Sequence, residues 1–175
     1  KAAKGYSIPA GIGRIYKDLR NIYKSYSEAC IALEYRFTSV DKNIIYFTDC
    51  KYSNAGYVYP LKAEDLLLNS LILGDKDSVL SNINQFFDEI TREGLNPATV
   101  KQICMQLGIS VLKKVKEFNI PIHLLNITDN HFFDMSRYET INDFRNNLIM
   151  NTYKIIKYLN ENKELRNKFE FKEIV

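Results

Sequence analysis

The sequence predicts an α+β fold that is predominantly α-helical, in which a small strand-helix-strand unit precedes an antiparallel helical bundle. Strand-like apolar runs occur only before about residue 50. From Tyr59 onward, apolar residues recur at three- and four-residue steps, which is the period of helices with one buried face. Residues that start or stop helices, such as Gly74 and the pair Asn96-Pro97, divide that part into segments.

The first segment, Gly11 to Phe37 and the residues before it, reads as a strand that runs into a long helix. Apolar residues alternate with proline and glycine from Ile8 to Gly13, which predicts a strand end where Gly11 and Gly13 serve a sharp turn. The helix is expected to bury one apolar stripe against the sheet: Leu19, Ile22, Tyr26, Ala29, Leu33 and Phe37. The opposite, solvated face is expected to carry Lys17, Lys24, Glu28 and Glu34.

The rest of the unit is short. Ala29 and Cys30 are small, so we expect the helix to approach the sheet closely beside them. A turn at residues 41–43 then leads to an apolar strand, Ile44 to Phe47. Residues 50–58 are polar and contain glycine, which predicts a linker or loop.

The helical part is predicted to begin at Tyr59-Pro60 and to contain about five helices. Its first helix spans 61–73, carries Glu64 in its first turn, where the helix dipole accommodates a carboxylate, and ends at Gly74 as a C-cap. Asp75 or Asp77 is expected to cap the second helix, which stops at Gly94.

The later helices have equally specific starts. Asn96-Pro97 places an N-cap before proline at the first helical position, and the helix is expected to reach about Asn119. A short helix is expected around residues 131–135. Thr140 and Asp143 resemble a capping box that starts the last long helix, to about Leu159.

One segment of the third helix imitates a helix-turn-helix motif. Cys104 followed by Gly108-Ile-Ser110 matches its second helix and turn, but Lys114 stands where an apolar anchor is required. One apolar face continues through the segment without a break, so a single continuous helix is the favoured prediction.

Other candidate chemistry is weak. Gly11-Ile-Gly13 lacks the further glycine of a dinucleotide fingerprint and the Gly-Lys-Ser/Thr of a phosphate loop. His123 and His131 lie near Asp129 and Asp134, but a metal site usually needs three converging ligands. We therefore predict no catalytic residue, no metal site and no cofactor, and we do not expect an enzyme.

The amino-acid composition is typical of a globular domain. The 175 residues are 46% apolar and 26% charged with a net charge of +3, which fits a globular domain and offers no basic run for nucleic acid or an anionic membrane. Three cysteines without metal-type spacing are expected to be reduced thiols, so a cytoplasmic location is expected. Because the chain opens at Lys1 just before a strand, we expect a fragment of a longer protein.

Several motifs resemble one family. They comprise Gly11-Ile-Gly13-Arg14, Ser25-Tyr26, Glu28-Ala29, Ala32-Leu33, Tyr59-Pro60, Glu64 and Leu73-Gly74-Asp75. This pattern resembles the region between the receiver and DNA-binding domains of AraC-type response regulators, over roughly residues 7–90. Residues 1–50 are also similar to the end of a degenerate GGDEF-like domain, without its catalytic signature.

The resemblance implies three parts: a partial GGDEF-like unit (1–50), a helical regulatory domain (51–168), and the start of a linker helix (169–175) to a DNA-binding domain absent from this chain. It implies a regulatory module of a transcription factor, a homodimer that meets DNA only through that absent helix-turn-helix domain. Gly11, Gly13, Tyr26, Ala29, Tyr59, Pro60, Glu64 and Gly74 are its structural motif residues.

Two functions stay open. In the first, the helical part senses a small effector or a partner, and exposed aromatic residues on the last helix, Phe144, Tyr153 and Tyr158, contribute the contact. In the second, the chain is a passive dimerisation and spacer module without a ligand. The ligand-binding residues and the effector are not identified by the sequence.

Overall fold

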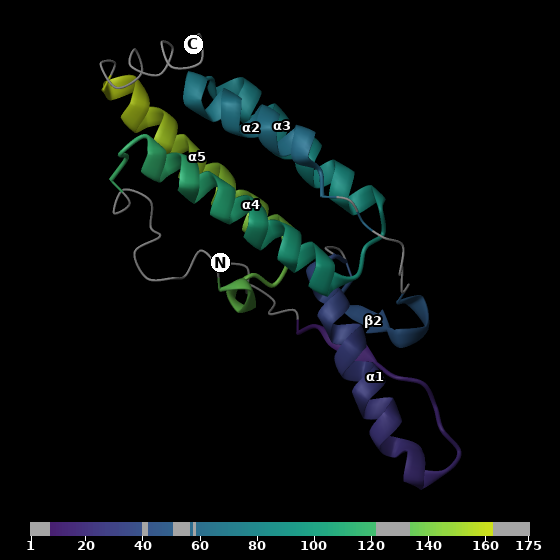
Figure 1. Cartoon of the computed structure of the whole chain (residues 1–175). Coiled ribbons are helices and arrows are strands. Elements are labelled where there is room, and N and C mark those ends of the chain that lie inside the picture. The colour runs from purple at the N-terminus through teal and green to yellow at the C-terminus, as the bar shows by residue number, and fades with distance from the viewer. Residues whose placement is uncertain (1–7, 40–41, 51–56, 58, 122–133, 163–175) are drawn as a thin grey trace, which may run out of the picture.

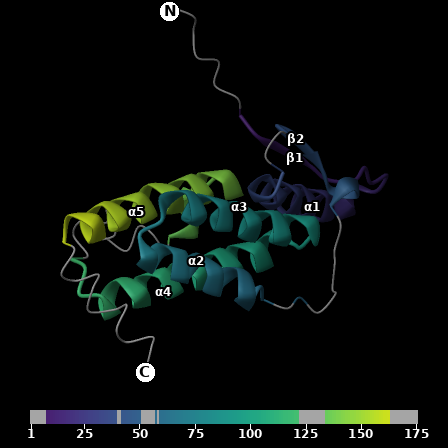
Figure 2. The same cartoon turned by 90° about the horizontal axis from the view of Figure 1, so that it is seen from above.

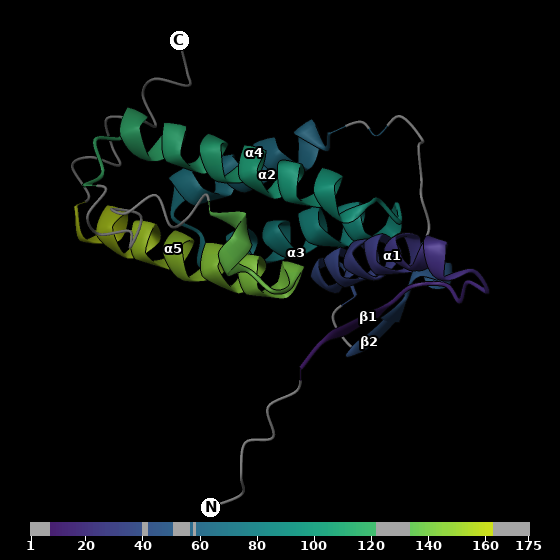
Figure 3. The same ribbon diagram turned by 90° about the horizontal axis from the view of Figure 1, so that it is seen from below.

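The computed structural model describes residues 8–39, 42–50, 57, 59–121 and 134–162 (Figure 1). Its described part contains two strands and five α-helices, which confirms a mostly helical α+β fold. The order is β1 (Ala10–Ile12), α1 (Ile22–Glu34), β2 (Ile44–Tyr46), α2 (Leu61–Leu73), α3 (Lys76–Arg92), α4 (Pro97–Glu117) and α5 (Ile141–Glu161). The strand-helix-strand unit lies at one end of the helical bundle, as Figures 2 and 3 show.

The two strands form a parallel pair with α1 as the crossover between them. Gly11 lies opposite Ile45 in the register, and these residues face α1. Their neighbours point to the other side of the sheet, because successive side chains of a strand alternate. That open face carries Ala10, Ile12, Ile44 and Tyr46, all exposed.

The predicted buried stripe of α1 is wrong. Ile22 and Tyr26 are 66% and 73% exposed, and of the six predicted residues only Phe37 is buried. The helix instead turns its small residues, including Ala29, toward the strands. A sheet of two short strands contacts only that narrow face, so the large apolar side chains remain in solvent.

The caps of the bundle follow the sequence prediction. Gly74 ends α2 with a φ of 67°, in the left-handed region that glycine favours. Asp75 caps α3 by accepting from the backbone amides of Asp77 and Ser78, and Gly94 after α3 has a φ of 59°. Gly74 and Asp75 therefore define the turn that joins α2 to α3.

The last two long helices are also bounded as predicted. Asn96 accepts a hydrogen bond from Thr99 at the start of α4, and Thr140 and Asp143 form the capping box of α5. Helix α4 continues through Gly108. The prediction of a single continuous helix, in place of a helix-turn-helix motif, is therefore confirmed. Phe47, expected in the second strand, lies in a 3₁₀ turn instead.

The helices joined by short turns are antiparallel, whereas α5 runs in the same direction as α4 (Figure 3). The ends of α2, α4 and α5 meet around Leu71, Val115 and Leu159. Helix α5 therefore begins at the end of the bundle opposite to the end where α4 stops.

The core fills the space between these helices. Phe144 is fully buried, with its ring centroid 6.2 Å from Phe87 and 5.2 Å from Tyr138, so its predicted exposure is wrong. Tyr153 and Tyr158 are half-buried against the same core. Of the three aromatic residues predicted to form a contact surface on α5, only Tyr153 and Tyr158 are therefore partly accessible.

Phe37 connects the two parts of the chain. It is buried with the residues of the bundle, and the Lys101 ammonium of α4 lies 5.3 Å from its ring centroid. The end of the first unit is therefore packed into the helical core.

Some predictions fall outside the described residues. They concern His123, Asp129, His131, most of the expected short helix, the segment 51–56 and the linker helix at 169–175. The described end of that expected short helix lies in a 3₁₀ turn, Met135–Arg137. In the part of the chain that the structure describes, no helix combines the length and the apolar character needed to cross a membrane.

Candidate functional site

Gly11 and Gly13 bring β1 into direct contact with the backbone of α1. A Cβ atom on Gly11 would lie 2.1 Å from the Ala29 carbonyl oxygen, and one on Gly13 would lie 2.0 Å from the Ser25 carbonyl oxygen. Neither glycine has a positive φ, and α1 begins only at Ile22. The glycines therefore serve close packing, and the predicted turn role is wrong.

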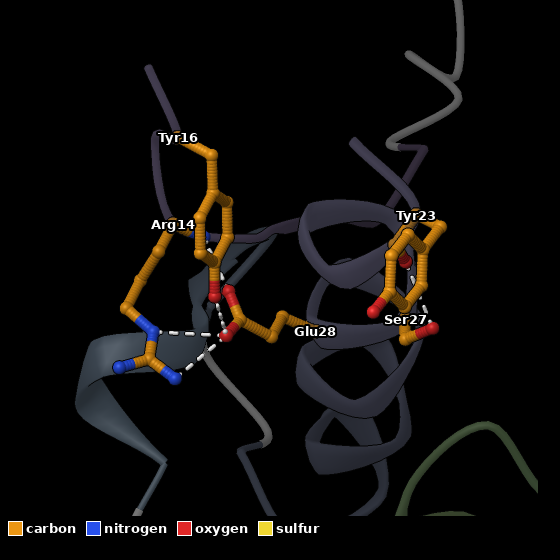
Figure 4. Close-up of polar contacts among 5 residues, drawn as sticks. All are labelled: Arg14, Tyr16, Tyr23, Ser27 and Glu28. Carbon is orange, nitrogen blue, oxygen red and sulfur yellow. Dashed lines mark hydrogen bonds and ion pairs between the residues drawn. The ribbon is translucent and has the colours of Figure 1, made fainter. Parts of the chain in front are cut away.

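Glu28 anchors the segment after β1 (Figure 4). Its Oε2 accepts from the Arg14 backbone amide at 2.8 Å, and its Oε1 accepts from Arg14 Nε at 2.9 Å, Arg14 Nη2 at 2.6 Å and the Tyr16 hydroxyl at 2.6 Å. The Arg14 guanidinium carbon also lies 5.1 Å from the centroid of the Phe47 ring. Glu28 is buried, so the prediction that it faces solvent is wrong.

This contact is structural in character. The hydrogen bonds from Arg14 lower the pKa of Glu28 from 4.5 to about 2, and the hydrogen bond from Tyr16 acts in the same direction. A carboxylate with so low a pKa is a poor general base at neutral pH. Both of its oxygens are already occupied, so the cluster ties the chain to α1.

A second polar cluster lies at the start of α2. The Tyr57 hydroxyl, the Tyr59 hydroxyl and Glu64 Oε2 are buried, and none has a hydrogen-bond partner among the residues that the structure describes. Buried polar atoms in proteins are nearly always paired, so three such oxygens close together are unusual, and the Tyr59 hydroxyl interacts with the side chain of Glu64. Glu64 as a whole is only 8% exposed.

The environment of the two phenols shows how these groups are placed. Burial raises the pKa of Tyr57 to about 12, with further contributions from Glu89 and Glu93. Burial also raises the pKa of Tyr59, and the neighbouring Glu64 carboxylate adds to this rise. Both phenols are therefore neutral at physiological pH and lie among carboxylates of α2 and α3.

A pocket of about 550 Å³ opens beside this cluster. Among the described residues, its lining includes Tyr57, Tyr59, Pro60, Leu61, Lys62, Glu89 and Glu93. The size lies within the range of small-molecule sites, and aromatic walls with a few polar groups are typical of them. The antiparallel hairpin creates the pocket, because it places the start of α2 beside the end of α3.

The predicted motif residues fall into two groups. Gly11, Gly13 and Ala29 meet where β1 contacts α1, and Tyr26 lies exposed on another face of α1. Tyr59, Pro60 and Glu64 lie at the pocket or next to it, and Gly74 ends α2 at its far end. The structure does not bring the two groups together in one site.

Three pocket residues are not indicated by the sequence pattern: Tyr57, Glu89 and Glu93. The helix hairpin was a usable signal, because a tight turn at Gly74 sets residues near 61 opposite residues near 89. The helix dipole alone does not account for the Glu64 carboxylate, because Glu64 is buried.

The described residues form no metal site, and their cysteines are free thiols. Within the described ranges, no group of three or more His, Cys, Asp or Glu side chains is arranged to hold a metal ion. Cys30 is exposed, Cys50 half-buried and Cys104 buried, each as a free thiol. Burial raises the pKa of Cys104 to about 12, which disfavours its reactive thiolate.

No family model, no curated protein and no solved structure matches this chain.

Proposed function

We propose that the chain is the non-catalytic regulatory part of an AraC-type transcription regulator, a cytoplasmic homodimer that binds a small effector in its helical part. DNA is contacted by a helix-turn-helix domain outside this sequence. The motifs around Gly11, Tyr26 and Tyr59 support the family. The observation that carries the sensing role is the pocket with three buried oxygens beside it.

The position of the pocket gives a route by which binding reaches the rest of the chain. Glu89 and Glu93 line the pocket, and the adjoining residues Ile90 and Thr91 line a smaller hollow of about 210 Å³ on α3. That hollow is also lined by Tyr35 and Thr38, which follow α1. A ligand that moves the end of α3 therefore acts on packing around the strand-helix-strand unit.

A second candidate function, the passive dimerisation and spacer module, rests on a different observation. The open face of the sheet carries Ile12, Ile44 and Tyr46 in solvent. Parallel sheets are almost always covered on both faces, so this surface suits a second copy of the chain.

Thermal unfolding of the 175-residue chain against a chemically diverse metabolite collection, with light scattering for the mass, separates the two functions. The sensor proposal expects at least one compound that raises the unfolding temperature in a saturable manner. A dimer that responds to no compound rejects the sensor and retains the spacer.

The spacer has its own matched pair of variants. Tyr46→Lys places a charge on the open face and is expected to convert a dimer to a monomer, whereas Thr48→Lys adds the same charge at an exposed position next to the strand. Equal mass of the two variants would reject this face as the interface.

A further inference from the structure

Negatively charged residues outnumber positively charged ones among the described residues around the pocket. Glu89 and Glu93 line it, and Glu64 lies behind Tyr59 with an unpaired buried oxygen. Lys62 is the one positive residue among the described lining residues. The resulting field favours a positively charged guest and disfavours an anion.

The aromatic walls point to the same class of ligand. Tyr57 and Tyr59 both line the pocket, and Tyr59 is held edge-on against Phe86 with the ring centroids 5.9 Å apart. The faces of tyrosine rings attract cations, and this attraction strengthens where water is excluded. Two such rings beside carboxylates resemble the lining of sites for organic ammonium groups.

The hydrogen-bonding needs of the cluster are specific. An ionised carboxylate can only accept hydrogen bonds, and the tyrosine hydroxyls can accept as well as donate. A buried carboxylate oxygen without a partner is costly, whereas a charge-assisted hydrogen bond to it is strong. An ammonium group brings three N–H donors and a positive charge, which suits the lining carboxylates Glu89 and Glu93.

We propose that this pocket binds a small organic cation, with a primary ammonium group between the lining carboxylates Glu89 and Glu93 and the two tyrosine side chains, and an apolar body against Pro60 and Leu61. The inference deepens the proposed function and rests on its sensor form. It assigns the effector to a chemical class.

The test is isothermal titration calorimetry of the 175-residue chain with three probes of similar size: 2-phenylethylammonium, neutral 2-phenylethanol and anionic 3-phenylpropanoate. We expect saturable binding of the ammonium probe and at least tenfold weaker binding of the other two. Comparable binding of all three probes, or no binding of the ammonium probe, overturns the inference.

Matched variants locate the binding. Glu64→Gln keeps the shape of the side chain and removes the negative charge next to Tyr59, and it is expected to weaken ammonium binding by about tenfold. Asp65→Asn makes the same change at the adjacent exposed residue of α2 and is expected to leave affinity within about twofold. Equal weakening by the two variants overturns the assignment of the site.

A second pair covers the case in which Glu64→Gln does not fold, as judged by circular dichroism. Glu89→Gln alters the pocket lining, whereas Asp88→Asn alters the neighbouring exposed position of α3. The inference stands if only Glu89→Gln weakens ammonium binding and falls if the two variants behave alike. A neutral or anionic effector found in the metabolite screen, without binding of the ammonium probe, rejects the cation and leaves the regulatory function standing.

Discussion

Arg14 and Glu28 are joined through both the backbone and the side chain of the arginine. The Arg14 amide donates to Oε2 at 2.8 Å, while the guanidinium donates to Oε1 of the same carboxylate. One carboxylate thereby fixes both the path of the chain after β1 and the position of the arginine head group. Because Glu28 lies in the middle of α1, the loop is held against the helix.

The pair makes a testable contribution at acidic pH. Its folded-state pKa of about 2 lies below the ordinary value of 4.5, so ionised Glu28 stabilises the fold above about pH 4.5. This stability is lost as the pH falls from about 4.5 toward 2. We expect Glu28→Gln to lower the thermal unfolding midpoint at pH 7, with a smaller difference from the wild type at pH 3.

Glu34→Gln is the control, because Glu34 is exposed on the same helix. A difference between Glu28→Gln and the wild type that stays constant from pH 7 to pH 3 would contradict the role of the ionised carboxylate.

Gly11→Ala is expected to disrupt the contact of β1 with α1. The added Cβ would lie 2.1 Å from the Ala29 carbonyl oxygen, and backbone cannot rotate away as a side chain can. Overpacking usually costs about 1–3 kcal/mol, and we expect this substitution to exceed about 3 kcal/mol in urea unfolding. Gly94→Ala meets nothing within 4 Å and suffers only from its φ of 59°, so it should cost about 1–2 kcal/mol. Equal costs would mean that close packing is not the reason for glycine at position 11.

Phe144→Ala is expected to destabilise the bundle by about 3–5 kcal/mol, because it leaves a cavity between Phe87 and Tyr138. Met150→Ala on the same helix removes a 59% exposed side chain and should change the free energy of unfolding by about 0.5 kcal/mol or less. Denaturant unfolding at equilibrium measures both. A small loss of stability in Phe144→Ala would contradict the burial of the Phe144 side chain. It would favour a role for this residue in a contact surface on α5.

Titration of Tyr57 should make the free energy of unfolding depend on pH in the alkaline range. Its pKa is raised from 10.0 to about 12, so the folded state prefers the neutral phenol. The contribution is fully present below about pH 10 and is lost as the pH rises from 10 toward 12. We expect Tyr57→Phe to lose less stability than the wild type between pH 9 and 11, as followed by chemical unfolding at each pH.

At pH 7 the same substitution removes a buried hydroxyl that has no partner among the described residues. It should therefore cost little stability while altering the pocket wall. Tyr26→Phe, at an exposed position, serves as the comparison and should follow the wild type at every pH. A Tyr57→Phe curve that also coincides with the wild type would show that the phenol is not shielded from solvent.

The helical part was predictable because its boundaries are local signals. Gly74, Asp75, Asn96-Pro97 and Thr140 act through hydrogen bonds to residues within one turn, so they can be read from short stretches of sequence. The continuous apolar face of α4 also predicts a single helix correctly, in spite of the residues around Gly108 that resemble a helix-turn-helix motif.

The orientation of α1 was not predictable in the same way. Large apolar residues such as Ile22 and Tyr26 define its most hydrophobic face, but contact with the glycines of β1 requires small side chains. Burial of Glu28 depends on Arg14, which is not a neighbour on the helix surface. The pocket likewise joins residues of α2 and α3 through the hairpin, and no local spacing marks Tyr57 and Glu93 as neighbours.

The tight connection between α2 and α3 also bears on how the chain folds. The entropy lost in closing a loop rises with its length, and contacts between residues close in sequence form fastest. The hairpin can therefore assemble before α5, which reaches it through the distant pair Asn84 and Arg145. Because the described pocket lining runs only from Tyr57 to Glu93, a bound ligand should accelerate folding as well as slow unfolding.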